Sequence, residues 1–120
     1  MDYWIWIFLG VFLVWILWFK QRGKVGADQA KEFVKSGALI LDVGTEKEFS
    51  KKHIPGVVNL PLHELVEKIS TLESDKSQVI LCHCLSGGRS AIAMSRLRKL
   101  GYSQAYNLGS YGQATAVLKN

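Results

Sequence analysis

The chain has 120 residues, a formal net charge of +5 and two cysteines. These values exclude a multidomain protein and a secreted scaffold held together by several disulfides. The apolar residues are unevenly distributed, since all four Trp and three of the five Phe fall in the first nineteen positions. The sequence therefore divides into an apolar head, residues 1–24, and a body of ordinary globular composition, residues 25–120. The basic residues of the body are scattered, so no nucleic-acid partner is expected.

The head contains a run from Tyr3 to Phe19 in which every residue except Gly10 is apolar. As a helix this run measures about 26 Å, slightly less than the roughly 30 Å hydrocarbon core of a bilayer. Tryptophans stand near both of its ends, as they do at membrane interfaces: Trp4, Trp6, Trp15 and Trp18. We therefore predict one N-terminal transmembrane helix, with residues 3–24 contacting membrane lipid.

A cleaved signal peptide is the alternative interpretation of the head, because Val25-Gly26-Ala27 offers the small residues that signal peptidase selects. The length of the apolar run, and the absence of a basic residue before it, favour an uncleaved anchor. Three basic residues follow the run and can also contact anionic lipid: Lys20, Arg22 and Lys24. The positive-inside rule therefore predicts a single-pass membrane protein whose body lies in the cytoplasm.

In the body, amphipathic stretches alternate with short apolar runs. The predicted helices cover Asp28–Lys35, Glu46–Lys52, Pro61–Ile69, Ser90–Leu100 and Gly112–Leu118. The predicted strands cover Ala38–Leu41, Val57–Val58, Val79–His83 and Gln104–Leu108, and Leu72–Gln78 is expected to be a polar loop. Thr45 and Glu48 have the spacing of a capping box. Alternating strands and helices predict an α/β fold, with helices on both faces of a mostly parallel sheet.

The segment after the strand at Val79–His83 is the candidate site, because ligands bind at the carboxyl ends of parallel strands. Cys84 lies just before a predicted helix, where the helix dipole and unpaired N–H groups favour a thiolate. Gly87 and Gly88 let backbone N–H groups point inward as an anion nest, and Arg89 adds a permanent charge. The pattern predicts a nucleophilic sulfur in an anion cradle, whereas a merely buried cysteine would not need these neighbours.

The segment 84–90, Cys-Leu-Ser-Gly-Gly-Arg-Ser, resembles the active loop of the single-domain rhodaneses, which reads Cys-x-x-Gly-x-Arg. The similarity covers about residues 25–118 and includes Leu41-Asp42-Val43, Glu48-Phe49, the segment 53–61 and Asn107-Leu108-Gly109. This resemblance implies a rhodanese-like three-layer domain with a sheet of four to five strands.

The rhodanese resemblance also implies a reaction. A sulfurtransferase thiolate attacks a sulfur donor, holds sulfane sulfur as a persulfide and passes it to a thiol acceptor. Cys84 would carry the sulfur and Arg89 would assist, while backbone N–H groups would bind the persulfide or donor anion at Leu85, Ser86, Gly87, Gly88 and Ser90. The donor would be thiosulfate or a low-molecular-weight or protein persulfide. No metal or organic cofactor is implied, and the sequence sets no oligomeric state.

Two other functions remain as alternatives. One is a non-catalytic rhodanese-like module for interaction or sulfur sensing at the membrane. The other is a cysteine-dependent phosphatase, because His83-Cys84 followed by an arginine is similar to the phosphate loop of those enzymes. That loop is one residue longer than the segment between Cys84 and Arg89, which favours sulfur transfer. Gly44 and Leu85 replace basic residues common in rhodaneses, so we expect a less cationic mouth and inefficient turnover of dianionic thiosulfate.

Several neighbours of the loop are candidates for supporting roles. Cys82 is a possible resolving thiol, but a buried core cysteine is favoured because a Cys-x-Cys disulfide is strained. Asp42 is either a residue that orients the loop by accepting backbone N–H groups or an exposed aspartate at a strand end. His83 and His53 are interpreted as hydrogen-bonded structural residues, and His63 as a surface residue.

Overall fold

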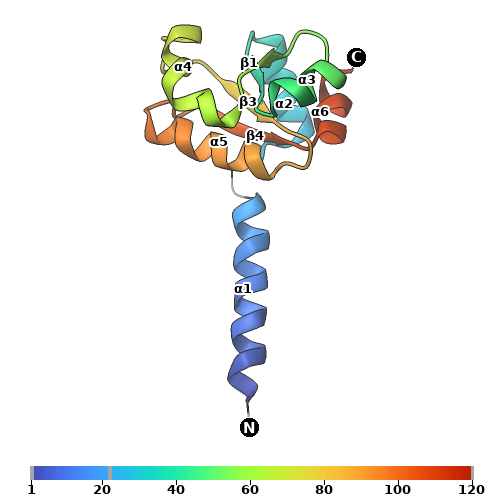
Figure 1. Cartoon of the computed structure of the whole chain (residues 1–120), viewed down its shortest axis with the longest axis vertical. Helices are drawn as coiled ribbons and strands as arrows, with labels where there is room; N and C mark the ends of the chain where they lie inside the picture. The colour runs from blue at the N-terminus through green and yellow to red at the C-terminus, as the bar shows by residue number, and fades with distance from the viewer. Residues whose placement is uncertain (1, 22, 120) are drawn as a thin grey trace.

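The computed structural model describes residues 2–21 and 23–119. A long N-terminal helix, α1 (Tyr3–Gln21), projects from an α/β domain that contains the remaining elements (Figure 1). The prediction of a helix over the apolar run is therefore confirmed. Within the two described ranges, however, no helix combines the length and the apolar character needed to cross a membrane, so the predicted transmembrane span is not supported. The side chains of Lys20 and Arg22 lie outside the described residues.

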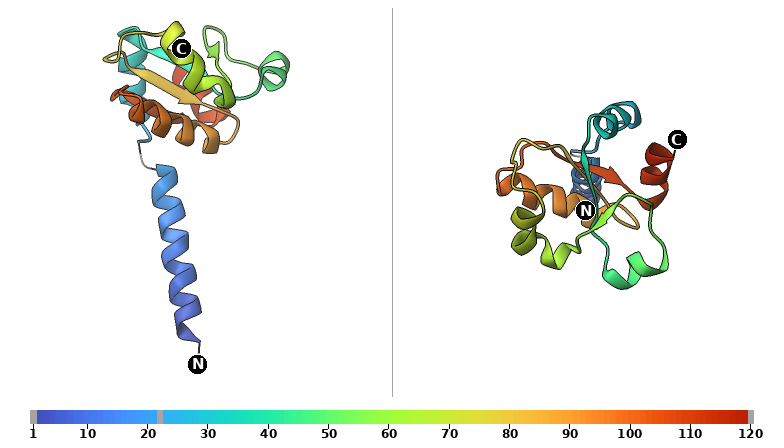
Figure 2. Two further views of the ribbon diagram at one scale, coloured as in Figure 1. Left: turned by 60° about the vertical axis from the view of Figure 1, so that its left-hand side comes forward. Right: turned by 90° about the horizontal axis from the view of Figure 1, so that it is seen from above.

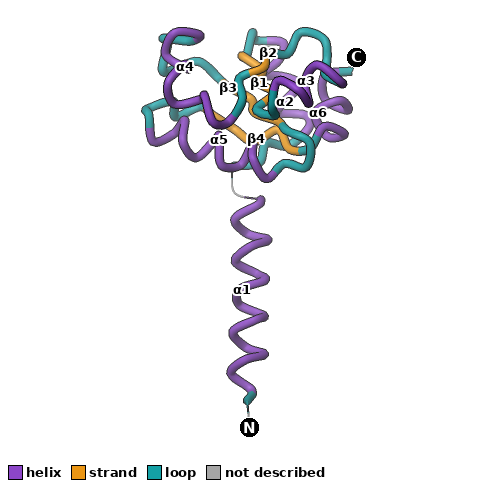
Figure 3. The backbone as a smooth tube through the Cα atoms, in the orientation of Figure 1, coloured by secondary structure: helices purple, strands orange, loops and turns teal. Residues whose placement is uncertain are grey.

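Four short strands form the centre of the domain: β1 (Leu39–Asp42), β2 (Val58–Asn59), β3 (Ile80–His83) and β4 (Ala105–Gly109). They form one sheet in the order β2-β1-β3-β4, and each neighbouring pair is parallel. Figure 3 shows the strands in orange among the purple helices. All residues of β3 are buried, as expected for an apolar strand with both faces covered. The predicted α/β class and parallel sheet are confirmed.

The helices cover both faces of this sheet: α2 (Ala27–Lys35), α3 (Glu46–Lys51), α4 (Leu65–Leu72), α5 (Gly88–Lys99) and α6 (Tyr111–Leu118). On one face, Leu65 of α4 and Leu97 of α5 are buried in one core cluster with β-strand residues. On the other face, Ala30 of α2 and Ala114 of α6 belong to a second cluster. The resulting three layers are visible from two further directions in Figure 2.

Two helices differ from the sequence prediction by more than one residue at a boundary. The segment expected to be a helix from Pro61 starts with a 3-10 turn (Leu62–Glu64) and then continues as α4 to Leu72, because Leu65 and Ile69 are drawn into the core. Helix α5 starts two residues earlier than predicted, at Gly88, after Gly87 adopts a left-handed φ of 94°. Glycine takes this conformation without the steric cost of a side chain.

The connector between α1 and the domain is bound to the edge of the sheet. The Asn107 N–H donates to the Gly23 carbonyl oxygen at 2.9 Å, and the Val25 N–H donates to the Asn107 carbonyl oxygen at 3.2 Å. Lys24 thereby forms a parallel bridge with Asn107. Backbone contacts with the domain therefore begin at Gly23, two residues after the end of α1.

The α5 interface gives the first prediction. Leu97 is 0% exposed in the core, whereas Ile92 on the same helix is 38% exposed. We expect Leu97→Ala to lower the free energy of unfolding by about 3 kcal/mol, because it removes buried methyl groups and leaves a cavity. Ile92→Ala is the matched control and should cost less than about 1 kcal/mol. Urea denaturation measures both, and equal losses would contradict this packing.

Candidate active site around Cys84

A pocket of about 190 Å³ lies at the carboxyl ends of β1 and β3. This is the position at which parallel α/β sheets bind ligands. The strand ends contribute Asp42 and His83, the segment after β3 contributes Cys84 and Leu85, and α6 contributes Tyr111. The remaining lining residues belong to α3 and its surroundings: Gly44, Glu48, Lys51 and Lys52.

The loop between β3 and α5 curls around the sulfur of Cys84. The Gly87 N–H donates to Cys84 Sγ at 3.0 Å, and Gly87 itself is left-handed. A Cβ atom at Gly87 would lie 3.4 Å from the carbonyl carbon of Gly109, so the two backbones approach closely here. The Cys84 N–H also donates to the Gly109 carbonyl oxygen at 3.2 Å. The loop is therefore fixed against the turn between β4 and α6.

A buried serine supports the sulfur from the first turn of α5. Ser90 Oγ lies 3.6 Å from Cys84 Sγ and 2.7 Å from Asn107 Oδ1. Asn107 Oδ1 also accepts the Gly109 N–H at 2.9 Å. With Cys84 as a thiol, the S–H donates to Ser90 Oγ while the serine hydroxyl donates to Asn107. Rotation of that hydroxyl lets it donate to the sulfur once a thiolate forms.

These donors outweigh the effect of burial on Cys84. Burial raises the pKa of the Cys84 thiol, but the Ser90 hydroxyl and the N–H groups of Ser90, Gly87 and Ser86 lower it further, so the net direction is downward. Cys82 has the opposite character, because its side chain is 0% exposed within the core. Burial, with the nearby Cys84 charge, raises the pKa of Cys82 to about 12. Of the two free thiols, only Cys84 lines the pocket.

Arg89 is held by a residue to which we had assigned only a capping role. Its guanidinium binds Glu48 with two contacts, Nη1 to Oε1 at 2.6 Å and Nη2 to Oε2 at 2.9 Å. This bidentate pair links α5 to α3 and lowers the pKa of Glu48 to about 2, so the carboxylate stays ionised in mildly acidic solution. The sequence predicts that Arg89 assists directly in binding an anion, but both terminal nitrogens of its guanidinium contact Glu48.

Glu48 has a second role within its own helix. Its Oε1 accepts the Thr45 N–H at 2.9 Å, and the Glu48 N–H donates to Thr45 Oγ1 at 3.1 Å. The capping box predicted from the sequence is therefore confirmed. The same carboxylate therefore caps α3 and binds Arg89. In the sequence, Glu48 was marked by its capping-box spacing from Thr45 and by the resemblance of Glu48-Phe49 to the rhodanese family.

Four expectations for individual side chains need correction or placement. Asp42 does not accept N–H groups of the Cys84 loop, since its Oδ1 accepts the Gly44 N–H at 2.8 Å and orients the loop before α3. His53 is hydrogen-bonded as predicted, with Nδ1 2.8 Å from the Phe49 carbonyl oxygen. The same prediction for His83 is wrong, because neither ring nitrogen has a hydrogen-bond partner among the described residues. His63 is exposed.

The mouth of the pocket contains two cations that the sequence reasoning missed. Lys51 and Lys52 end α3 and line the pocket, and Lys52 Nζ lies 4.4 Å from the centre of the Tyr111 ring. The sequence feature that could have indicated these lysines is their position directly before segment 53–61, which resembles the rhodanese family. Asp42 in the same lining carries a negative charge, whereas Glu48 is paired with Arg89. Leu85 adds an apolar surface at the mouth, with 62% of its side chain exposed.

The fold and the cysteine loop together define a class of protein. Residues 26–113 match the model of the rhodanese-like domain, so the chain belongs to the rhodanese-like family. No group of three or more His, Cys, Asp or Glu side chains within the described residues is arranged to hold a metal ion.

Three individual proteins of known name are similar to this chain. The chain is 37% identical over 90 residues to the putative sulfur carrier protein YrkF of Bacillus subtilis, covering 75% of this chain and 43% of YrkF. It is 32% identical over 69 residues to thiosulfate sulfurtransferase PspE of Escherichia coli, covering 58% of this chain and 66% of PspE. Human single domain sulfurtransferase TSTD1 has a similar solved structure, with a TM-score of 0.67 and 26% identity over 78% of this chain and 96% of that protein.

The environment of the sulfur predicts its titration. We expect the Cys84 thiolate to form at a pH below the usual range for cysteine, and Ser90→Ala to raise the apparent pKa by about one pH unit, because a donor to the charged sulfur is lost. At pH 7 the variant should therefore react more slowly with iodoacetamide. Ultraviolet absorbance of the thiolate against pH measures this directly.

Ser103→Ala, at an exposed position, is the control for the Ser90 substitution and should titrate like the unmodified chain. An unchanged titration in Ser90→Ala would show that the serine does not stabilise the thiolate. Cys82 should remain unmodified in both variants while the protein is folded.

Proposed function

We propose that the protein is a sulfurtransferase that carries sulfane sulfur on Cys84 as a persulfide. The observation that carries this proposal is the Cys84 sulfur itself, which lies in a pocket and accepts the Gly87 N–H at 3.0 Å at the start of α5. A thiolate at this position is a nucleophile, and the same donors stabilise a charged sulfur adduct. Membership of the rhodanese-like family supports the proposal.

The loading step needs no group beyond the donor and the thiolate. Cys84 Sγ attacks the outer sulfur of a donor R–S–SH, the S–S bond of the donor breaks, and its electron pair leaves on R–S⁻. The product is Cys84–S–SH, whose outer sulfur lies in the nest of the loop. Arg89 acts indirectly, because its pairing with Glu48 fixes the start of α5 against α3.

The charges around the pocket favour a persulfide donor over thiosulfate. Lys51 and Lys52 are balanced by Asp42 and the Cys84 thiolate, and Glu48 is paired with Arg89. A dianion therefore meets little net attraction at this mouth, whereas a persulfide with an apolar portion can contact Leu85 and Tyr111. In this proposal thiosulfate is a slow donor, although the similar protein PspE is named a thiosulfate sulfurtransferase.

Persulfide formation gives the central functional prediction. After exposure to a low-molecular-weight persulfide, intact-mass spectrometry should detect one added sulfur on the protein, located on Cys84 by peptide mapping. Cys84→Ser should lose both this signal and sulfur transfer to an acceptor. Cys82→Ala is the matched control and should load normally, because Cys82 lies in the core with a raised pKa.

A protein that binds donors without loading Cys84 would be the non-catalytic module instead. Loading of Cys82→Ala together with loss of loading in Cys84→Ser would support the proposal. Sulfur found on Cys82 would contradict it.

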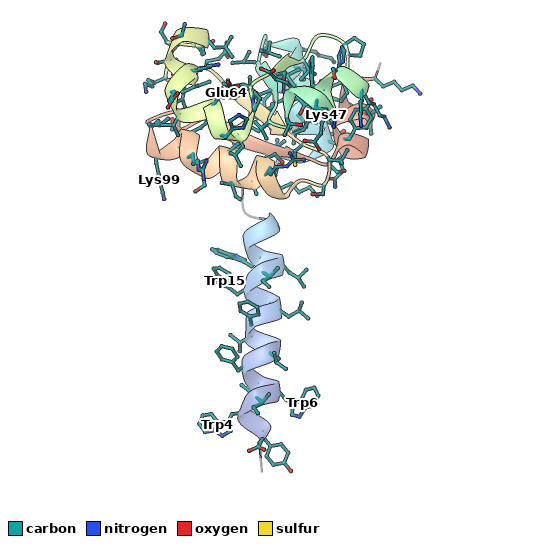
Figure 4. The ribbon with its side chains drawn as sticks, in the orientation of Figure 1. Trp4, Trp6, Trp15, Lys47, Glu64 and Lys99 are labelled. Carbon is teal, nitrogen blue, oxygen red and sulfur yellow. The ribbon has the colours of Figure 1, made fainter. Side chains whose placement is uncertain are left out.

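We also propose that residues 3–24 contact membrane lipid and that the domain lies on the cytoplasmic side. Apolar side chains are exposed all along α1, among them Leu9, 49% exposed, and Leu13, 57% exposed. Trp4 and Trp6 lie near the free end of α1 and Trp15 lies nearer the domain (Figure 4). Indole rings favour the two interfacial regions of a bilayer.

The side of the domain next to α1 supports the same placement. Helix α5 runs along this side in Figure 1, and its last turn contains Arg96, Arg98 and Lys99. Lys99 lies at the lower edge of the domain in the view of Figure 4. Basic groups at this edge are suited to an anionic lipid surface, and the positive-inside rule then favours the cytoplasmic side.

Charged substitutions in α1 test the lipid contact. We expect Leu9→Arg combined with Leu13→Arg to move the protein from the membrane fraction to the soluble fraction, because each arginine costs about 2.5–3.5 kcal/mol in an apolar membrane environment. Val66→Arg is the control, since Val66 is an exposed apolar residue of α4 with 52% exposure. Fractionation followed by immunoblotting measures the distribution. Identical distributions of the α1 variant and the control would refute the lipid contact.

A further inference from the structure

The floor of the pocket contains a buried imidazole with no assigned partner. His83 ends β3 next to Cys84, lines the pocket and is 0% exposed. Neither Nδ1 nor Nε2 has a hydrogen-bond partner among the described residues. Because a buried polar group without a partner is destabilising, its presence in a pocket calls for a ligand or a reaction that uses it.

The surroundings of His83 are suited to accepting a proton. Nε2 lies 3.9 Å from Asp42 Oδ2, a distance at which the carboxylate stabilises an imidazolium. Tyr111 packs edge-on, with ring centres 6.3 Å apart. The titratable or charged groups lining the same pocket are Asp42, Glu48, Lys51, Lys52, Cys84 and Tyr111. Burial lowers the pKa of His83 more than Asp42 and the Cys84 backbone raise it, so the net effect favours the neutral ring.

Transfer of sulfur to a thiol contains a step for which such a base is useful. An acceptor thiol attacks as a thiolate, but an ordinary thiol is largely protonated near pH 7. The Cys84 thiolate itself needs no base, because its pKa is lowered by the loop. The free imidazole is therefore available for the acceptor.

We propose that His83 is the proton acceptor for the incoming thiol in the second half-reaction, with Asp42 as a positioning residue. This inference rests on the proposed sulfur-carrier function of Cys84. The acceptor R–SH transfers its proton to His83, and its thiolate attacks the outer sulfur of Cys84–S–SH. The S–S bond of Cys84 breaks with its electron pair remaining on Cys84 Sγ, and R–S–SH is released. His83 then returns its proton to solvent.

Single-turnover transfer from preloaded Cys84 persulfide tests this assignment with two kinds of acceptor. A low-molecular-weight thiol must lose a proton, whereas sulfite in alkaline buffer attacks through a sulfur lone pair that carries none. We expect His83→Gln to slow transfer to the thiol roughly 10²-fold, the lower range for a general base, and to leave transfer to sulfite within about twofold. His63→Gln, at an exposed position, is the matched control.

The pH dependence separates a base from a structural residue. In the unmodified chain the thiol-transfer rate should rise as His83 loses its proton and then level off. In His83→Gln that limb should disappear, and the rate should follow ionisation of the acceptor thiol alone. Asp42→Asn should produce a smaller loss with a limb displaced to lower pH, because the carboxylate no longer stabilises the imidazolium.

The two proposals fail in different ways. Equal slowing with thiol and sulfite in His83→Gln, or no slowing with either, would overturn the role of His83 while leaving Cys84 as the carrier. Absence of Cys84 persulfide in the unmodified chain would overturn the sulfurtransferase proposal itself. Thermal unfolding selects whichever of His83→Gln and His83→Asn is fully folded at the assay temperature, and the rates are compared in that variant.

Discussion

The close approach of two backbones at Gly87 and Gly109 is the constraint on which the site depends. Both glycines have positive φ, 94° and 104°, and a Cβ at Gly109 would lie 2.1 Å from Gln113 Oε1. That oxygen accepts the Ser110 N–H in the cap of α6. Because no side chain intervenes, the loop after β3 can curl until the Gly87 N–H reaches Cys84 Sγ. The pKa of the Cys84 thiol is thus lowered by the Ser90 hydroxyl and by backbone N–H donors rather than by a neighbouring base.

The curled loop is held from both sides by residues distant in the chain. Asn107 of β4 accepts a hydrogen bond from the Ser90 hydroxyl on its side chain and is hydrogen-bonded to the connector through its backbone. Asn107 therefore links the segment after α1 to the serine beside Cys84. Glu48 holds Arg89 from α3. Polar groups that are buried and mutually satisfied fix a single arrangement, which keeps the donors aimed at the sulfur. The energetic contribution of Glu48–Arg89 is modest because the pair is partly exposed, so its main effect is positional.

Much of the fold and the position of the nucleophile were predictable from local signals. The apolar run at Val79–His83, the glycines after Cys84 and the cap at Thr45 each act within a few residues of the feature they specify. The pairing of Glu48 with Arg89 was not predictable in this way, because it joins positions 41 residues apart through tertiary packing. That His83 has no hydrogen-bond partner among the described residues depends equally on what surrounds it in space. Asp42 was placed correctly at a strand end, but the choice between two neighbouring loops for its hydrogen bond required the three-dimensional arrangement.

The proposed sulfur transfer depends on which residue holds one additional sulfur atom. The most direct measurement is a crystal structure of the full chain after reaction with a low-molecular-weight persulfide. We predict electron density for one extra sulfur bonded to Cys84 Sγ, within hydrogen-bonding distance of the N–H groups of the 84–90 loop and facing the pocket that His83 lines. An extra sulfur on Cys82, or an unmodified Cys84 in protein that has transferred sulfur, would contradict the assignment of Cys84 as the carrier.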